Sequence, residues 1–309
     1  MLHVIAQLFI EQGLNGLQLG ITLFLMAAGL TLVFGIMDVI HLSHGSFYML
    51  GAYLTATLGA RFDSYLLGLA LAIPLVALIG MVVEWIAIRR LYERDHLDQV
   101  LATFGLIMFF NEAVRMIWGA QPIFLSPPAS LAGTVELLPG LFYPQFRLAI
   151  LGTGLAVAAL LGLMIRRTRL GMRLRAGASD RAMAGALGVN IDGLFTIVFG
   201  LGTGLAALAG GMAGTVLSVQ VGMGESILIL TFVVVVIGGI GSIKGALVGA
   251  VLVGLVDTLA RTMLPVALRS TLPASQADSV AASLSSTSVY VLMILVLAWR
   301  PKGLYGART

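Results

Sequence analysis

The sequence predicts an all-α fold, a polytopic transmembrane helical bundle that forms a single domain over residues 1–309. Hydrophobic residues make up 59% of the 309 residues, charged residues make up only 10%, and the mean hydropathy is +1.03. A chain this apolar cannot bury its hydrophobic surface in one water-facing core, so it belongs in a membrane. The 38 glycines favour helices that pack closely against one another. The chain has no cysteine, which excludes disulfides and thiol chemistry.

The predicted membrane helices are charge-poor apolar runs, because a spanning helix needs about 20 such residues. About nine runs meet this requirement. Because the ends of the runs are defined only to within several residues, the prediction allows eight to ten spans. In chain order the runs are 14–36, 45–60, 65–88, 98–118, 147–165, 194–217, 226–241, 244–263 and 285–299. The runs 45–60 and 226–241 are short, and the sequence leaves open whether they cross fully.

The basic residues predict the orientation of the chain. They cluster at Arg89, Arg90 and Arg94, in the arginine-rich stretch 166–181, and at Arg300, Lys302 and Arg308, which together hold 12 of the 18 Lys and Arg residues. A nine-span path places all three clusters on the cytoplasmic face, with the N-terminus outside and the C-terminus inside. The loops 120–146 and 264–285 are then external. Because the basic residues follow the ends of apolar runs, the net charge of +4 does not indicate nucleic-acid binding, and the expected surroundings are membrane lipid.

Two glycine-bearing breaks, Asp38 to Gly45 and Gly238 to Gly245, interrupt the apolar runs, one in each half of the chain. Lipid does not tolerate unpaired backbone, so a broken helix must be buried among other helices or line a wet cavity. Paired breaks of this kind are typical of repeat-built transporters, which makes Gly239 and Gly241 candidates for a translocation pathway. The second break lacks the spacing of a phosphate-binding loop, so no nucleotide or other cofactor is predicted.

Polar side chains gather at the first break, where Asp38, His41 and His44 stand close in sequence. Two histidines without a third ligand do not make a metal site, so no metal is predicted. Asp38 and His44 are instead expected to fix the broken backbone or to line the cytoplasmic end of the pathway.

The run 98–118 contains three polar residues near its outer end. Glu112 and Arg115 have the i,i+3 spacing of an ion pair and are expected to anchor the outer boundary beside Trp118. Asn111 lies deeper and is the better pathway candidate.

The segment 166–193 contains six arginines and a short predicted helix between two long apolar runs. Ser179 is expected to cap this helix, Asp180 suits its positive end, and Gly188 can terminate it. A helix of about eight residues does not persist alone in water, so it must pack against something. We expect a soluble partner; the alternative is packing on the chain's own cytoplasmic ends.

Four stretches resemble the permease subunits of bacterial ABC importers for branched-chain and other hydrophobic amino acids. They are GLTLVFGIMDVIHLSHGSFYMLGAY at 29–53, the loop 168–188, IGGIGSIKGALVG at 237–249 and RPKGLYG at 300–306. Together they are specific, although each alone would only be suggestive. Asp38 and His41 depart from the residues expected in many relatives, which leaves the exact substrate open.

The resemblance implies a pore of two such permeases in the bacterial inner membrane, either identical chains or a pair of sister chains. It also implies two cytoplasmic ATPase subunits and a periplasmic or extracellular solute-binding protein. His44 and Gly45 match the family's His-Gly step after the first span. The residues that match the ATPase-contacting segment are Gly171, Arg175, Ala176, Asp180, Ala184 and Gly188.

These features predict a transport subunit that catalyses no covalent reaction itself and is driven by ATP hydrolysis on a separate chain. Permeases for urea or short amides are closely similar and remain an alternative. A proton-coupled secondary transporter, with Asp38, His44 and Glu112 as titrating groups, is an alternative from a different class. The arginine-flanked segment argues against it, because a carrier that works alone does not need a docking element.

Overall fold

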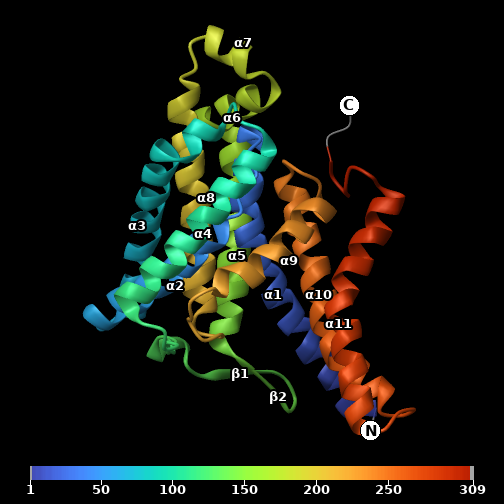
Figure 1. Ribbon diagram of the computed structural model, residues 1–309. Coiled ribbons are helices and arrows are strands. Elements are labelled where there is room, and N and C mark those ends of the chain that lie inside the picture. Colours follow the sequence, from blue (N-terminus) through green and yellow to red (C-terminus); the bar gives the residue numbers. More distant parts are fainter. Residues whose placement is uncertain (1, 307–309) are drawn as a thin grey trace. The chain divides into compact units, whose positions relative to one another are not determined.

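A computed structural model of the chain describes the backbone of residues 2–306 and the side chains of residues 7–306. Arg308, part of the third basic cluster, lies outside this range. Among the residues described, the elements of regular secondary structure are helices and one short hairpin (Figure 1). Its helices are α1 (Leu2–Met37), α2 (His44–Arg61), α3 (Tyr65–Ile86), the 3₁₀ helix η1 (Ile88–Leu91), α4 (His96–Trp118), the 3₁₀ helix η2 (Ala129–Leu131), α5 (Gln145–Arg167), α6 (Arg169–Ser179), α7 (Arg181–Ala186), α8 (Ile191–Ala213), α9 (Met223–Gly238), α10 (Ile243–Leu268) and α11 (Ala274–Trp299).

Each of the nine predicted runs falls largely on one helix, which confirms the all-α, polytopic prediction. Among the described residues, 7 helices are long and apolar enough to cross a membrane: α1, α3, α4, α5, α8, α10 and α11. The other two, α2 and α9, are the helices on the two short runs; α9 has 16 residues, fewer than a perpendicular span requires. The structure therefore supports seven spans by length and composition, and the count of nine stays a prediction.

The two predicted loops differ in structure. The stretch 120–146 contains η2 and an antiparallel hairpin of β1 (Thr134–Leu138) and β2 (Leu141–Pro144), in which Thr134 pairs with Pro144. The stretch 264–285, in contrast, is mostly helical, because α10 continues to Leu268 and α11 begins at Ala274.

The serines and the two prolines of the stretch 264–285 do not prevent helix formation. Pro265 lies in the last turn of α10, where few backbone bonds remain to be lost. Within the stretch, Ser270 donates to the Ala267 oxygen at 2.6 Å and Ser283 donates to the Ser279 oxygen at 3.2 Å, so these hydroxyls are compatible with helical backbone.

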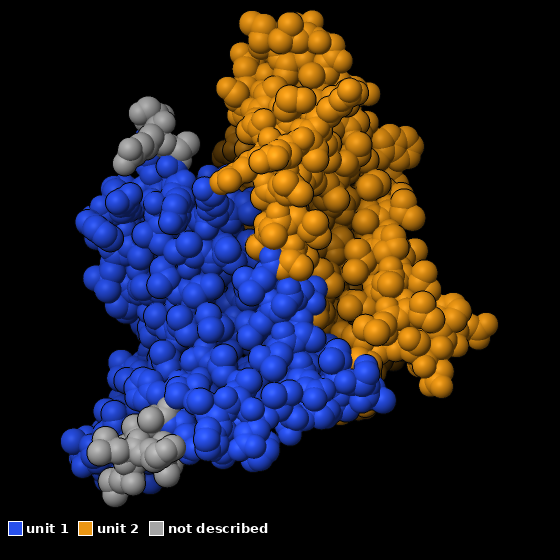
Figure 2. All heavy atoms as spheres, turned by 180° about the vertical axis from the view of Figure 1, so that it is seen from behind, with its two compact units in different colours: residues 1–24, 129–155, 230–309 blue, residues 25–128, 156–229 orange. Residues whose placement is uncertain are grey.

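The chain forms two compact units, which Figure 2 distinguishes by colour. Unit 1 takes the residues up to Phe24, Ala129–Leu155 and the residues from Leu230 on; unit 2 takes Leu25–Pro128 and Ala156–Ile229. Helices α1, α5 and α9 each contribute to both units, so the units are not consecutive domains along the sequence.

Unit 1 is built on close backbone contact between the first part of α1 and α10. A Cβ on Gly16 would meet the Gly254 oxygen at 3.0 Å, and a Cβ on Gly20 would meet the Ala250 oxygen at 2.8 Å. Small residues four apart thus let two helix backbones approach, in agreement with the close packing expected from the glycine content. The α9–α10 turn is covered by the C-terminal segment, where the amide of Leu304 donates to the Ile237 oxygen at 2.8 Å.

Unit 2 is built around α8, which packs against α2, α3 and the second part of α1. A Cβ on Gly51 would overlap the backbone of Ala207, and a Cβ on Gly210 would overlap the carbonyl of Tyr48. Tyr48, Phe47 and Phe199 are almost fully buried around this contact. The glycines therefore set the distance between α2 and α8, and this packing positions the start of α2.

Candidate functional site

The first predicted break is present between Met37 and His44. Asp38 ends α1 in a left-handed conformation with φ of 52°, and its amide still donates to the Phe34 oxygen at 3.1 Å. This conformation is uncommon for a residue with a side chain but is tolerated by aspartate, so Asp38 acts here as a helix terminator. The amide of Ile40 is satisfied by the Gln99 side chain of α4 at 3.1 Å.

The break turns the chain back into the helix bundle. The His44 ring lies 3.0 Å from the position of a Cβ on Gly29, which is eight residues before Met37. At about 1.5 Å per residue, α2 therefore begins roughly 12 Å back from the end of α1. His41 and His44 are fully buried, and the His41 ring lies 4.7 Å from the Phe199 ring.

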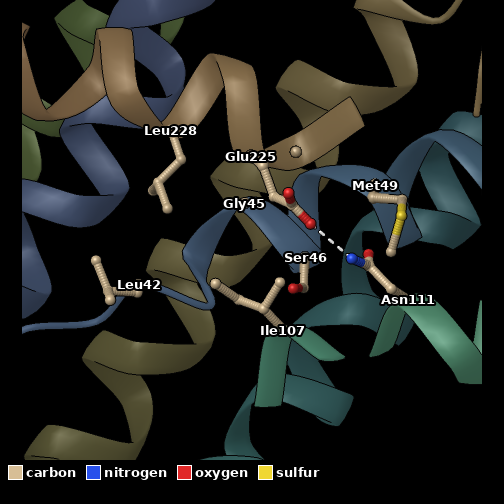
Figure 3. A pocket seen from close by; sticks show the side chains of 9 residues that line it. Leu42, Gly45, Ser46, Met49, Ile107, Asn111, Glu225 and Leu228 are labelled. Atoms are coloured by element: carbon tan, nitrogen blue, oxygen red, sulfur yellow. Dashed lines mark hydrogen bonds between the residues drawn. The ribbon is translucent and has the colours of Figure 1, made fainter. Parts of the chain in front are cut away.

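A small pocket lies where α2, α4 and α9 meet, next to the residues at which the break ends and α2 begins (Figure 3). It can exist because α2 and α9 touch through glycine: a Cβ on Gly45 would overlap the carbonyl of Gly224, and a Cβ on Gly224 would overlap that of Gly45. The pocket has room for a water-sized group. Its lining consists of Leu42, Gly45, Ser46, Met49, Ile107, Asn111, Gly224, Glu225 and Leu228.

The polar centre of the pocket is a hydrogen bond from Asn111 Nδ2 to Glu225 Oε1 at 2.6 Å. Figure 3 shows the Glu225 carboxylate directed to Asn111, away from Leu42 and Leu228. Glu225 lies in the first turn of α9, where the positive end of the helix dipole favours a carboxylate. Among residues 7–306 no basic side chain pairs with it.

The pocket lies within the length of a membrane-spanning helix. Asn111 precedes Trp118, the last residue of α4, by seven residues, which corresponds to about 10 Å along the axis. The Trp118 indole donates to Thr57 Oγ1 at 2.6 Å. Glu225 is exposed at this depth, and an exposed carboxylate is costly in lipid, so this surface must face water or a polar partner.

The structure places the six predicted pathway residues in different surroundings. Gly45 and Asn111 line the pocket, His44 is buried beside it, and Asp38 terminates α1. Gly239 and Gly241 lie in the α9–α10 turn with φ of 98° and 81°. A Cβ on Gly239 would meet the backbone of Gly306, which gives this glycine a packing role.

Glu225 is the charged residue of the pocket, and the sequence reasoning missed it. A signal was present, because Glu225 is the only acid between Asp192 and Asp257. The predicted run begins at residue 226 and therefore leaves Glu225 just outside it. The neighbouring ion pair was predicted: Arg115 Nη1 and Glu112 Oε2 lie 3.1 Å apart, with both side chains exposed.

The arginine-rich segment folds as two helices, α6 and α7. Thr168 caps α6 by accepting the Gly171 amide at 3.1 Å, and Asp180 caps α7 by accepting the Met183 amide at 2.9 Å. The predicted helix is therefore present, but its cap is Asp180 and not Ser179, which is the last residue of α6. Gly188 follows α7 with φ of 85°, a conformation that suits glycine.

The six residues expected to contact an ATPase do not share one surface. Gly171 and Ala184 are buried, whereas Arg175, Ala176, Asp180 and Gly188 are exposed. Arg175 donates to the backbone oxygen of Ile165. Three apolar side chains on the segment are instead open to solvent: Met172 is 55% exposed, Met183 58% and Leu187 78%.

In unit 2, a polar cluster around the buried carboxylate of Glu84 connects α3 with η1 and with the start of α8. It accepts from Arg89 Nε at 3.2 Å, from the Tyr92 hydroxyl at 2.6 Å and from Thr196 Oγ1 at 2.7 Å. Burial, followed by the hydrogen bond to Glu84, raises the pKa of Tyr92. Hydrogen bonding to the same carboxylate is the largest cause of the raised pKa of Arg89.

The segment α6–α7 lies against the N-terminal end of α8, next to this cluster (Figure 1). The Arg181 guanidinium lies 5.4 Å from the centre of the Phe195 ring, and the Tyr92 ring packs edge-on against Phe195 at 5.3 Å. The first two basic clusters therefore meet at the start of α8.

Helices of membrane-spanning length, a re-entrant break beside a polar intramembrane pocket, and a basic helical segment at one end define a polytopic transport protein. A family model, described as the permease component of the branched-chain amino acid transport system, matches residues 13–297. This match covers most of the chain, and the chain belongs to that family.

Several curated relatives extend over nearly the whole chain. The high-affinity branched-chain amino acid transport system permease protein BraD of Pseudomonas aeruginosa is 30% identical over 314 residues, covering 96% of each chain. The corresponding protein LivH of Escherichia coli is 29% identical over 313 residues, also covering 96% of each. A probable branched-chain amino acid permease of Methanocaldococcus jannaschii is 27% identical and covers 77% of this chain and 76% of its own. No solved structure matches the chain significantly.

Proposed function

We propose that this chain is the permease subunit of an ATP-binding cassette importer that carries branched-chain or other hydrophobic amino acids across the bacterial plasma membrane. The observation that carries the proposal is the family match over residues 13–297. Cytoplasmic ATPase subunits supply the energy, a second permease, identical or sister, completes the pore, and an external solute-binding protein delivers the amino acid.

The proposed orientation places the N-terminus outside and the C-terminus in the cytoplasm. Support comes from the meeting of the basic residues of η1 and of α6–α7 at one end of α8, where Arg89 also donates to Thr196 Oγ1 at 2.7 Å. In this orientation α6 and α7 lie in the cytoplasm, and the hairpin β1–β2 belongs to an external loop.

The proposed coupling element is the pair α6–α7, within the segment 166–193. Its inner face rests on the chain itself through the buried side chains of Leu174 and Ala184. Its outer face presents Met172, Met183 and Leu187 among arginines. Exposed apolar side chains beside charge are typical of a protein interface, so ATPase closure would push this element against the start of α8 as a rigid body.

The test of the coupling element is Met183→Glu combined with Leu187→Glu. Both side chains are exposed, so the fold should be kept, while two buried carboxylates at the interface should reduce co-purification of the ATPase at least about tenfold. The control is the exchange Met183→Leu with Leu187→Met, which keeps the apolar surface and should keep the partner. Normal ATPase association of the double glutamate variant would show that the coupling surface lies elsewhere.

A further inference from the structure

We propose that Glu225 and Asn111 form the subsite that receives the ammonium group of the transported amino acid. The inference rests on the proposed function, because it assigns a recognition role within that transport pathway. Its starting point is the small α2–α4–α9 pocket, whose polar centre is the 2.6 Å hydrogen bond between these two side chains.

The pocket offers acceptors where an ammonium group needs them. An ammonium group has three N–H donors and no acceptor. Asn111 uses its amide nitrogen on Glu225, so its oxygen stays available, and the Glu225 carboxylate and the Ser46 hydroxyl line the same space. Figure 3 shows the Glu225 carboxylate and the Asn111 amide directed at each other, with Ser46 nearby, and the pocket has room for a water-sized group and so for an ammonium.

The charge of the pocket favours a cation. Glu225 has no basic partner among residues 7–306, unlike Glu112, the residue directly after Asn111, which is paired with Arg115. A negative charge without a counter-ion inside a span needs water or a passing cation to offset its desolvation. The helix dipole at the first turn of α9 stabilises the Glu225 carboxylate. It does so without a basic side chain, which would repel the ammonium group.

The remaining lining suits an aliphatic side chain. Leu42, Ile107 and Leu228 line the pocket together with the polar groups, and Figure 3 shows Leu42 and Leu228 on the side away from Asn111. An amino acid whose ammonium binds Glu225 would therefore extend its apolar part over Leu42 and Leu228. The glycine contact between Gly45 and Gly224 keeps α9 close enough for this arrangement.

The test compares Glu225→Gln with Glu112→Gln in the complete importer, reconstituted in liposomes with ATP inside and saturating leucine-loaded binding protein. Each variant removes one negative charge from an exposed glutamate and keeps its volume. We expect leucine uptake to fall about tenfold in Glu225→Gln, the loss of a hydrogen bond to a charged group, and to change less than about twofold in Glu112→Gln.

A third variant, Glu225→Asp, separates charge from shape. It keeps the charge on a side chain shorter by one methylene, so its uptake should lie above that of Glu225→Gln. Wild-type uptake by Glu225→Gln, or uptake by Glu225→Asp at or below that of Glu225→Gln, overturns the ammonium subsite. Failure of the wild-type importer to carry leucine would instead count against the proposed function, so the two failures are distinguishable.

Discussion

The buried carboxylate of Glu84 gives a stability prediction whose size follows from its contacts. Glu84 is fully buried and accepts four hydrogen bonds, two from Arg89, one from Tyr92 and one from Thr196. Glu84→Ala leaves these donors unpaired, and removing one partner of a buried ion pair costs about 3–5 kcal/mol. Because the Arg89 side chain is 30% exposed and can regain water, we expect the lower end of that range, about 3 kcal/mol.

The assay is heat unfolding of the purified chain in detergent, followed by the fluorescence of its 3 tryptophans. A loss of about 3 kcal/mol should lower Tm by roughly 6–12 °C for a chain of this size. The matched control is Glu112→Ala, which breaks an exposed pair with Arg115 and should cost less than about 1 kcal/mol. Adding Arg89→Ala to Glu84→Ala should cost less than the sum of the single changes, because the two residues share one interaction.

Equal Tm values for Glu84→Ala and Glu112→Ala would refute the reasoning. Such a result would mean that the cluster at the start of α8 is open to water and does not hold η1, α3 and α8 together.

Two further predictions concern the same end of unit 2. Tyr92 has a raised pKa in the folded state, so its contribution to stability is complete below the unfolded value of about 10 and is lost as pH rises above it. Tm should therefore fall less between pH 9 and 11.5 in Tyr92→Phe than in the wild type; parallel curves would contradict the burial of the hydroxyl. Asp180→Ala removes the α7 cap, which is worth about 1 kcal/mol, so hydrogen exchange at the Met183 amide should speed up about fivefold. Ser179→Ala is the control, and equal acceleration in both variants would argue against Asp180 as the cap.

The helices and the breaks between them could be predicted from the sequence because their causes are local. A run of about 20 apolar residues specifies a membrane helix wherever it lies, and Asp38 with the following polar residues ends one. The stretch 264–285 was misjudged for a local reason as well. Its serines and prolines resemble a loop in composition, yet the hydroxyls of Ser270, Thr271 and Ser283 donate to backbone carbonyls three or four residues back, as hydroxyls in helices do.

The pocket could be predicted only in part, because Asn111 and Glu225, which form its central hydrogen bond, are far apart in the chain. Asn111 was expected to lie on the pathway, but its partner Glu225 is 114 positions away, and no local pattern links them. The cluster around Glu84 shows the same limit. Arg89 and Tyr92 lie only 5 and 8 positions after Glu84, whereas Thr196 is 112 positions away. Pairings of this kind follow from how α8 packs, which a single sequence does not specify.

The most direct test of the account is the energy source for uptake. Liposomes that contain the chain, its partner permease, the ATPase subunits and the binding protein should accumulate leucine only with ATP inside, and collapse of the proton gradient should not reduce that accumulation. Uphill leucine transport by the purified chain alone, driven by a proton gradient, would contradict the assignment as an ABC permease subunit.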